Sequence, residues 1–144
     1  MAKHKTLGSL GKSLIEIAER SQINIIDGVR KAALVTDQVA VVLTPVDTGF
    51  ARSRWQASIG EPVASEPAAE GRVEVGEEIS TAIALSQANN EIKKWKGFGS
   101  IFITNPLDYV RYLDQGSSDQ APQGMADDAV NAGLGVLKEL RILD

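Results

Sequence analysis

Residues 10–43 read LGKSLIEIAERSQINIIDGVRKAALVTDQVAVVL, a stretch without proline whose apolar residues recur at helical spacing. Steps close to multiples of 3.6 residues place one set of side chains on a single stripe: Leu14, Ala18, Ile25, Val29, Ala32, Val39 and Leu43. The pattern predicts one long amphipathic helix. A kink or break at Asp27-Gly28 is compatible with it, because glycine costs about 1 kcal/mol relative to alanine inside a helix. Pro45 ends the helix, since proline disfavours helical geometry at the residue before it.

The chain after this helix predicts a turn and two strands. Asp47-Thr48-Gly49 is a turn signal, because the Asp side chain accepts from nearby backbone amides and Gly tolerates positive φ. Residues 52–59 alternate with a period of two, which predicts a half-buried strand. One face of this strand would carry Ser53, Trp55, Ala57 and Ile59, and the other face Arg52, Arg54, Gln56 and Ser58. The stretch 61–71, EPVASEPAAEG, predicts a flexible hairpin loop, and residues 72–75 a short return strand.

Residues 77–104 predict a second helix followed by a strand. The helix is expected from Glu77 to about Trp95, with Ile79, Ile83 and Ile92 on its apolar side. After Gly97-Phe98-Gly99, the apolar run 101–104 is too short for a helix. It predicts a strand buried on both faces.

Two further helices are expected near the end of the chain. Asn105-Pro106 is typical of a helix start, and this helix is expected to stop at Gly116. Pro122 opens the last helix, with apolar positions Met125, Ala129, Val136, Leu137 and Leu140. Asp127 and Asp128 near its start and Lys138 and Arg141 near its end complement the helix dipole.

The order of these elements predicts a single α+β domain over residues 1–144. It has a long N-terminal helix, a small and mainly antiparallel sheet of about three or four strands, and C-terminal helices. Residues 1–9 are expected to form a basic flexible tail.

Composition argues against several classes of function. The chain has no cysteine, and its one histidine, His4, lies in the basic tail with Lys3, Lys5 and Lys12. Cysteine-based metal sites and thiolate nucleophiles are therefore excluded, and a Ser-His or His-metal site has almost nothing to build on. We expect no enzyme activity, no cofactor and no metal. The net charge of −4 does not suit a general nucleic-acid binder.

Membrane insertion and secretion are not expected either. No apolar run approaches the ~20 residues that cross a bilayer. The N-terminus lacks the apolar stretch of a signal peptide, so the protein is expected to be made in a cytoplasm.

Two segments invite a functional interpretation and also have a structural one. Lys93-Lys94-Trp95-Lys96 with Phe98 resembles the basic and aromatic pairs of single-strand binders, but it also suits a solvated helix end with Trp95 anchored in the core. The acidic set is better explained by solubility and helix capping than by acid–base or metal chemistry: Asp108, Asp114, Asp119, Asp127 and Asp128.

Two other segments carry a family resemblance. The first is TPVDTGFARSRW at 44–55, which follows the long helix. The second is NPLDYVRYLDQG at 105–116, followed by QAPQGM at 120–125. Together they resemble the neck and tail-completion proteins of tailed bacteriophages, a family of minor tail components that includes tail-terminator-like proteins. Val110 and Asp114 are mild departures from the family pattern, which usually has alanine and glutamate there. Phe50 and Arg52 also depart from it, because an arginine-leucine pattern is more usual after the turn, and the helix around 77–95 is longer than the family norm.

The resemblance implies a structural virion protein without enzyme activity. It implies an α+β domain that assembles with itself as a ring, commonly a hexamer, at the head–tail junction. Its partners would be portal or adaptor proteins or tail-tube proteins, with DNA passing through without sequence-specific contact. Alternatives are a head-completion adaptor or stopper of the connector and, from another class, a small nucleic-acid-binding module.

The polar loops and one acidic stretch supply the candidate functional residues. The candidate subunit or partner interface is Asp47, Thr48, Gly49, Arg52, Ser117, Gln120 and Pro122. Equally, these residues could serve only to shape the fold. The candidate lumen wall is Glu66, Glu70, Glu74, Glu77 and Glu78, because an acidic surface repels phosphates and lets DNA slide. The alternative is that these acids only keep the surface soluble.

Overall fold

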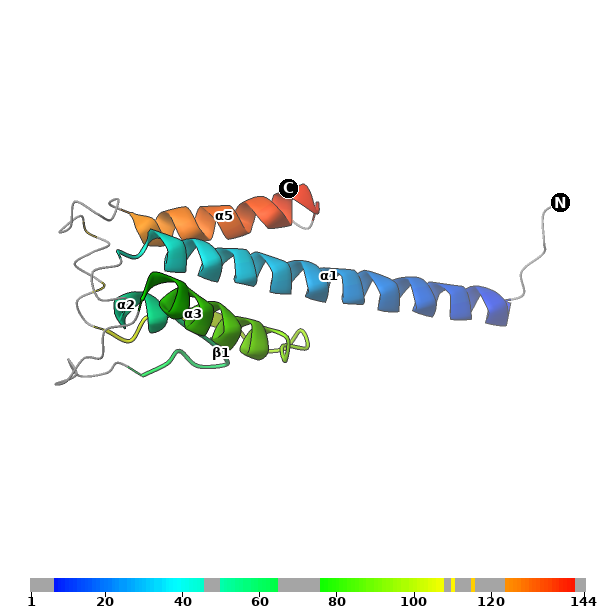
Figure 1. Ribbon diagram of the computed structural model, residues 1–144. Coiled ribbons are helices and arrows are strands. Elements are labelled where there is room, and N and C mark those ends of the chain that lie inside the picture. Colours follow the sequence, from blue (N-terminus) through cyan, green and yellow to red (C-terminus); the bar gives the residue numbers. More distant parts are fainter. Residues whose placement is uncertain are drawn as a thin grey trace.

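The computed structural model describes residues 7–45, 50–64, 76–107, 110, 115 and 124–141, with only the backbone for 7–10 and 23 (Figure 1). Its elements are α1 (Leu7–Leu43), α2 (Phe50–Ser53), β1 (Gln56–Ile59), α3 (Glu77–Ile92), β2 (Ile101–Thr104) and α5 (Met125–Glu139). The described chain is thus mostly helical with a small antiparallel sheet, an α+β arrangement.

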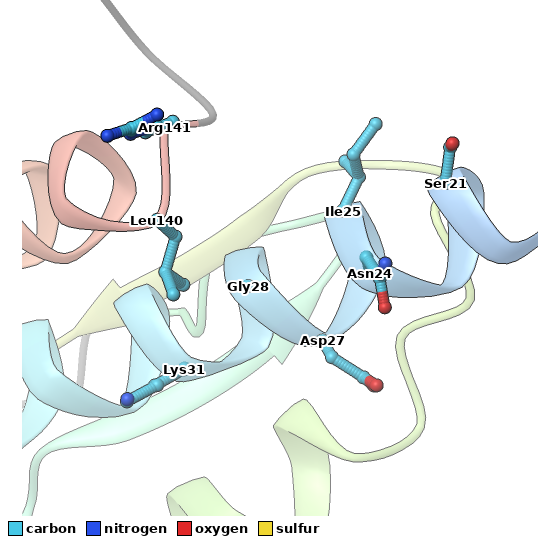
Figure 2. A pocket seen from close by; sticks show the side chains of 8 residues that line it. All are labelled: Ser21, Asn24, Ile25, Asp27, Gly28, Lys31, Leu140 and Arg141. Carbon is cyan, nitrogen blue, oxygen red and sulfur yellow. The ribbon is translucent and has the colours of Figure 1, made fainter.

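Helix α1 covers the whole range 10–43 and continues without a break through Asp27-Gly28. The glycine is buried where α5 ends, and Leu140 points towards α1 beside it (Figure 2). In Figure 1, α5 lies antiparallel along the C-terminal half of α1, and the N-terminal half projects well beyond the rest of the molecule.

The packing of α5 on α1 is close. A Cβ added at Gly133 would lie 2.0 Å from the Thr36 hydroxyl oxygen and 3.0 Å from the carbonyl oxygen of Ala32. The acids Asp127 and Asp128 occupy the first turn of α5 and Lys138 the last, as the sequence predicts. The helix begins after Gly124, whose φ is 82°, and the expected start at Pro122 falls in a part of the chain that the structure does not describe.

The sheet pairs β1 with β2 in antiparallel register, with Ala57 opposite Ile103. The other edge of β1 is bonded by a side chain of α3. The Gln87 amide accepts from the Ala57 N–H (2.8 Å) and donates to the Ala57 carbonyl (2.9 Å), as a neighbouring strand would do. The predicted return strand 72–75 is not among the described residues, so the sheet has two strands in the part of the chain that is described.

The buried face of α3 differs from the prediction. Its buried residues are Ser80, Ala84, Ala88 and Ile92, spaced by four. Ile79 and Ile83 are 62% and 48% exposed, so their assignment to the apolar side is wrong. Small side chains let α3 pack closely on the rest of the fold, and this outweighs the larger apolar area of the two isoleucines. The helix also ends at Ile92 rather than at Trp95.

Two strand predictions are also corrected. Residues 50–53 form one turn of helix, α2, closed by the Ser53 hydroxyl donating to the Phe50 carbonyl at 2.8 Å. The strand predicted from residue 52 therefore begins only at Gln56. Strand β2 is half-buried rather than buried on both faces. Most of the predicted flexible loop 61–71 and of the predicted helix 105–116 is outside the described residues.

The core lies at the end of the molecule where α1 stops. One cluster of buried side chains joins α1, α2, α3 and α5 with the chain after β2: Ala40, Val41, Ala51, Trp55, Ala84, Leu107, Val110, Met125 and Ala129. A smaller cluster of Ala57, Ala88 and Ile92 lies between β1 and α3.

Candidate subunit interface

The C-terminus of α1 is held by a buried hydrogen-bond network around Thr44. The Thr44 hydroxyl donates to the Ala40 carbonyl at 2.7 Å and accepts from the indole Nε1–H of Trp55 at 2.7 Å. Thr44 is 0% exposed, so these bonds satisfy a polar group that would otherwise be costly to bury. The indole of Trp55 thereby ties the start of the sheet to the end of the long helix.

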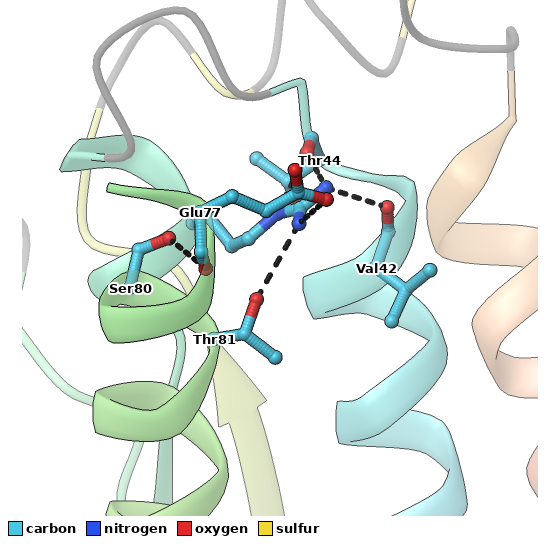
Figure 3. Close-up of polar contacts among 6 residues, drawn as sticks. Val42, Thr44, Glu77, Ser80 and Thr81 are labelled. Atoms are coloured by element: carbon cyan, nitrogen blue, oxygen red, sulfur yellow. Dashed lines mark hydrogen bonds and ion pairs between the residues drawn. The ribbon is translucent and has the colours of Figure 1, made fainter. Parts of the chain in front are cut away.

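Arg52 completes this network with its guanidinium (Figure 3). Its Nε and Nη2 donate to the Thr44 carbonyl at 3.1 and 2.9 Å, and Nη2 also donates to the Val42 carbonyl at 2.9 Å. Nη1 reaches the Glu77 carboxylate at 3.3 Å and the Thr81 hydroxyl at 3.4 Å. A positive charge on the last carbonyls of α1 complements the negative end of the helix dipole.

The two segments that carry the family resemblance meet at this end of the molecule. The Asn105 side-chain amide donates to the Ala51 carbonyl at 2.8 Å, and its oxygen accepts from the Leu107 N–H at 3.2 Å. Ala51, Leu107 and Met125 then share the larger core cluster. Residues 44–45, 50–55, 105–107 and 125 therefore form one structural unit, although more than 50 positions separate Ala51 from Asn105.

Arg52 is the one predicted interface residue within the described chain. Its 7% exposure leaves little of the side chain for a partner, and its bonds give it a clear role inside the fold. The remaining interface candidates, Asp47, Thr48, Gly49, Ser117, Gln120 and Pro122, fall outside the described residues. By sequence they belong to the connections that join α1 to α2 and that precede α5.

Two of the five lumen-wall candidates are described. Glu77 and Glu78 are exposed in the first turn of α3, where acids also complement the helix dipole. Glu77 pairs with Arg52, and its side chain remains 70% exposed. Glu66, Glu70 and Glu74 are not among the described residues.

A surface that the sequence did not single out is the projecting half of α1, which we call the arm (residues 7–25). Leu14, Ile15 and Ile17 are 58%, 59% and 58% exposed, and Ile25 is 48% exposed. Leu14, Ala18 and Ile25 belong to the apolar stripe of the predicted amphipathic helix, and all three are exposed in this half of the helix. The cause is that α5 covers the stripe only along the other half (Figure 1).

A second apolar surface is a groove of about 360 Å³ beside α5. Its floor is formed by α1 residues such as Val29 and Ala33, and its walls by α5 and by the Trp95–Ile101 segment. Val130 and Leu134, one turn apart on α5, are 50% and 38% exposed at this groove. Sequence reasoning missed the groove because its walls are distant in the chain.

Where α5 ends, there is a second hollow, a notch of about 690 Å³ (Figure 2). It is lined on α1 by Ser21, Asn24, Ile25, Asp27, Gly28 and Lys31, and at the end of α5 by Leu140 and Arg141. The lining is mixed, with both charges present, and its apolar members continue the exposed stripe of the arm.

Two residues of the Lys93–Lys96 segment, Lys94 and Trp95, form bonds within the fold. The Trp95 indole donates to the Gly99 carbonyl at 2.9 Å, and the Trp95 carbonyl accepts from Arg30 Nε at 2.9 Å. Lys94 pairs with Glu91 at 2.8 Å. Phe98, between two glycines of positive φ, is 81% exposed.

Asp37 is the buried ionisable group that stands out. It is 0% exposed on α1, and neither carboxylate oxygen has a hydrogen-bond partner among the residues described. Burial raises the pKa of the Asp37 carboxyl from 3.8 to about 7. Asp37 lines neither the groove beside α5 nor the notch at its end.

Within the described ranges there is no group of three or more acidic or histidine side chains placed to hold a metal ion. None of the helices in that part of the chain combines the length and apolar character of a bilayer span. Comparison with protein families, characterised proteins and solved structures found no match to this chain.

Proposed function

We propose that this protein is a structural component of a tailed-phage virion that completes the neck or tail at the head–tail junction. It acts there without catalysis, as a ring of identical subunits through which DNA passes. The ring is proposed to be hexameric and to contact portal or adaptor proteins on one side and tail-tube proteins on the other.

The observation that carries this proposal is the meeting of the two resemblance segments. Asn105 from the second segment bonds to Ala51 of the first, and the Thr44 carbonyl of the first segment accepts from Arg52, a residue that departs from the family pattern. Separate matches in a sequence gain weight when the residues that match form one packed unit, because such residues depend on one another. The exposed apolar arm gives independent support, since large uncovered apolar surfaces mark sites of protein–protein contact.

The lumen-wall proposal rests on fewer observations, because only two of its five residues are described. Glu77 and Glu78 are exposed and stand at the end of the molecule where α1 and α2 meet α3. They would line the channel if this end faces the axis of the ring.

A phage that lacks the gene tests the proposal. We expect DNA-filled heads and separate tails by electron microscopy, with joining restored by the wild-type gene. Cryo-electron microscopy of complete virions then locates the protein. Complete virions formed without the gene, or a position outside any ring, would overturn the proposal. The layer of the neck at which the protein is found distinguishes tail completion from the adaptor and stopper alternatives.

One observation favours a second candidate, a small nucleic-acid-binding module. Phe98 is 81% exposed beside exposed Lys93 and Lys96, a combination that suits base stacking and phosphate contact. A single-strand binding assay at several salt concentrations tests it. Affinity that falls steeply with salt and is lost in Phe98→Ala would favour this candidate.

A further inference from the structure

We propose that the arm of one copy docks head to tail into the groove beside α5 of a second copy. The inference rests on the proposed function for its closure into a ring, but the contact itself is argued from the surfaces of the chain.

The arm cannot be covered by its own molecule's groove. Helix α1 is continuous from Leu7 to Leu43, and it forms both the arm and the floor of the groove. A straight helix does not double back, and the arm projects beyond the part of α1 that lies beside α5, so it cannot reach the groove of its own copy (Figure 1). The arm therefore needs another molecule to bury Leu14, Ile15 and Ile17.

The partner surface is the groove because the two are alike in chemistry and size. The stripe that α5 covers on α1 continues along the arm through Leu14, Ala18 and Ile25. At 1.5 Å per residue, the arm is about 28 Å long, and α5, which walls the groove, is about 22 Å long. A groove of about 360 Å³ takes a few aliphatic side chains from one face of a helix rather than the whole helix.

Pairing of two arms with each other is less favourable. The exposed apolar positions described on the arm span less than the three or four heptads over which a coiled coil is usually sustained. An arm on a preformed groove needs no second unsupported helix. A head-to-tail pair of copies still has one free arm and one free groove, so further copies add until the ring closes.

Disulfide trapping tests the contact directly, because the chain has no cysteine of its own. Leu14→Cys and Leu134→Cys are purified separately, mixed and oxidised. We expect a covalent dimer in the mixture at least tenfold above the level in either variant alone. A variant carrying both substitutions should give a ladder of linked copies. Arm–arm dimers of Leu14→Cys as the main product, or no dimer in the mixture, would overturn the inference.

Light scattering on protein without engineered cysteines gives a second test, because it measures association in the absence of a covalent link. Leu14→Asp on the arm and Leu134→Asp in the groove should each weaken association at least tenfold. Ile83→Asp, on an exposed part of α3 that lines neither surface, is the matched control and should leave association unchanged. Wild-type protein that stays monomeric up to about 1 mM, or loss of association only in the control, would overturn the contact.

These outcomes separate the contact from the proposed function. A ring seen in virions together with arm–arm trapping would overturn the contact alone. If disulfides form between positions 14 and 134 but virion imaging places the protein outside any ring, the neck assignment alone would be overturned.

Discussion

Arg52 should stabilise the protein mainly through the carbonyls that it binds. Replacing it in Arg52→Met keeps much of the side-chain volume but leaves the Thr44 and Val42 carbonyls without this donor. We expect a loss of about 2–4 kcal/mol in the free energy of unfolding, measured by urea denaturation. Arg20→Met, at an exposed position on the arm, should change it by less than about 0.5 kcal/mol.

The ion pair from Arg52 to Glu77 should matter far less than the bonds to α1. The Glu77 side chain is 70% exposed, so solvent screens the pair. Glu77→Gln is expected to cost less than about 1 kcal/mol in the same measurement. A cost equal to that of Arg52→Met would mean that the pair, and not the helix carbonyls, gives Arg52 its effect.

Asp37 should make the protein less stable as pH rises. Its carboxyl titrates near 3.8 in the unfolded chain and near 7 in the folded one, so the folded state holds an extra proton between these values. The resulting stability is complete below pH 3.8 and is lost as pH rises through 7. A shift of this size corresponds to about 4 kcal/mol.

The isosteric variant Asp37→Asn isolates this effect because its amide does not titrate. Chemical denaturation of both proteins from pH 4 to pH 8 should show the wild type losing stability relative to the variant. The difference should be largest above pH 7. Parallel pH profiles for the two proteins would show that Asp37 is solvated or paired in the folded state.

The contact between α1 and α5 depends on one glycine and not on its neighbour. A Cβ at Gly133 would meet the Thr36 hydroxyl and the Ala32 carbonyl, whereas a Cβ at Gly135 would meet nothing within 4 Å. Gly133→Ala is therefore expected to destabilise the protein by about 1–3 kcal/mol through overpacking. Gly135→Ala should stabilise it by about 0.5–1 kcal/mol through helix propensity. Thermal unfolding midpoints that move in the same direction would contradict this packing.

Sequence patterns predicted elements whose evidence is local. The long helix has an uninterrupted apolar period without proline, and α5 carries its acids and its lysine at the dipole-complementing ends. The choice of buried face on α3 could not be read locally, because Ile79 and Ile83 have the same spacing as Ser80 and Ala84. Close packing favours burial of the small residues Ser80 and Ala84, and this depends on the surface against which α3 packs.

The missed functional surfaces have the same explanation. Nothing in the stripe from Leu14 to Leu43 marks where α5 stops covering it, so the arm could not be distinguished from a buried helix. The alternation in residues 52–55 resembled a strand, and nothing in it reveals the bonds from Arg52 to Thr44 and Val42, eight or more positions earlier. Exposed fractions and long-range bonds separate these cases, whereas residue periodicity does not.

The arm should exchange its amide hydrogens quickly in the isolated protein. Short helices without tertiary contacts are marginal in water, and the arm has its apolar side chains exposed. Hydrogen exchange at low protein concentration should show weak protection for residues 11–22 and strong protection for residues 32–41 of the same helix. At concentrations where copies associate, protection of the arm should rise. An arm that is equally protected at every concentration would show that it needs no partner.

The Gln87 amide on β1 also bears on how the protein can misfold. An unpaired strand edge is a template for recruiting other chains into fibrils, and the Ala57 N–H and carbonyl would form such an edge if they were free. Because one side chain occupies both groups, growth of the sheet at this point is blocked without the use of another strand. In the proposed role, in which many copies gather while a virus particle is built, this arrangement directs association to the helices, where contacts can be reversed and corrected.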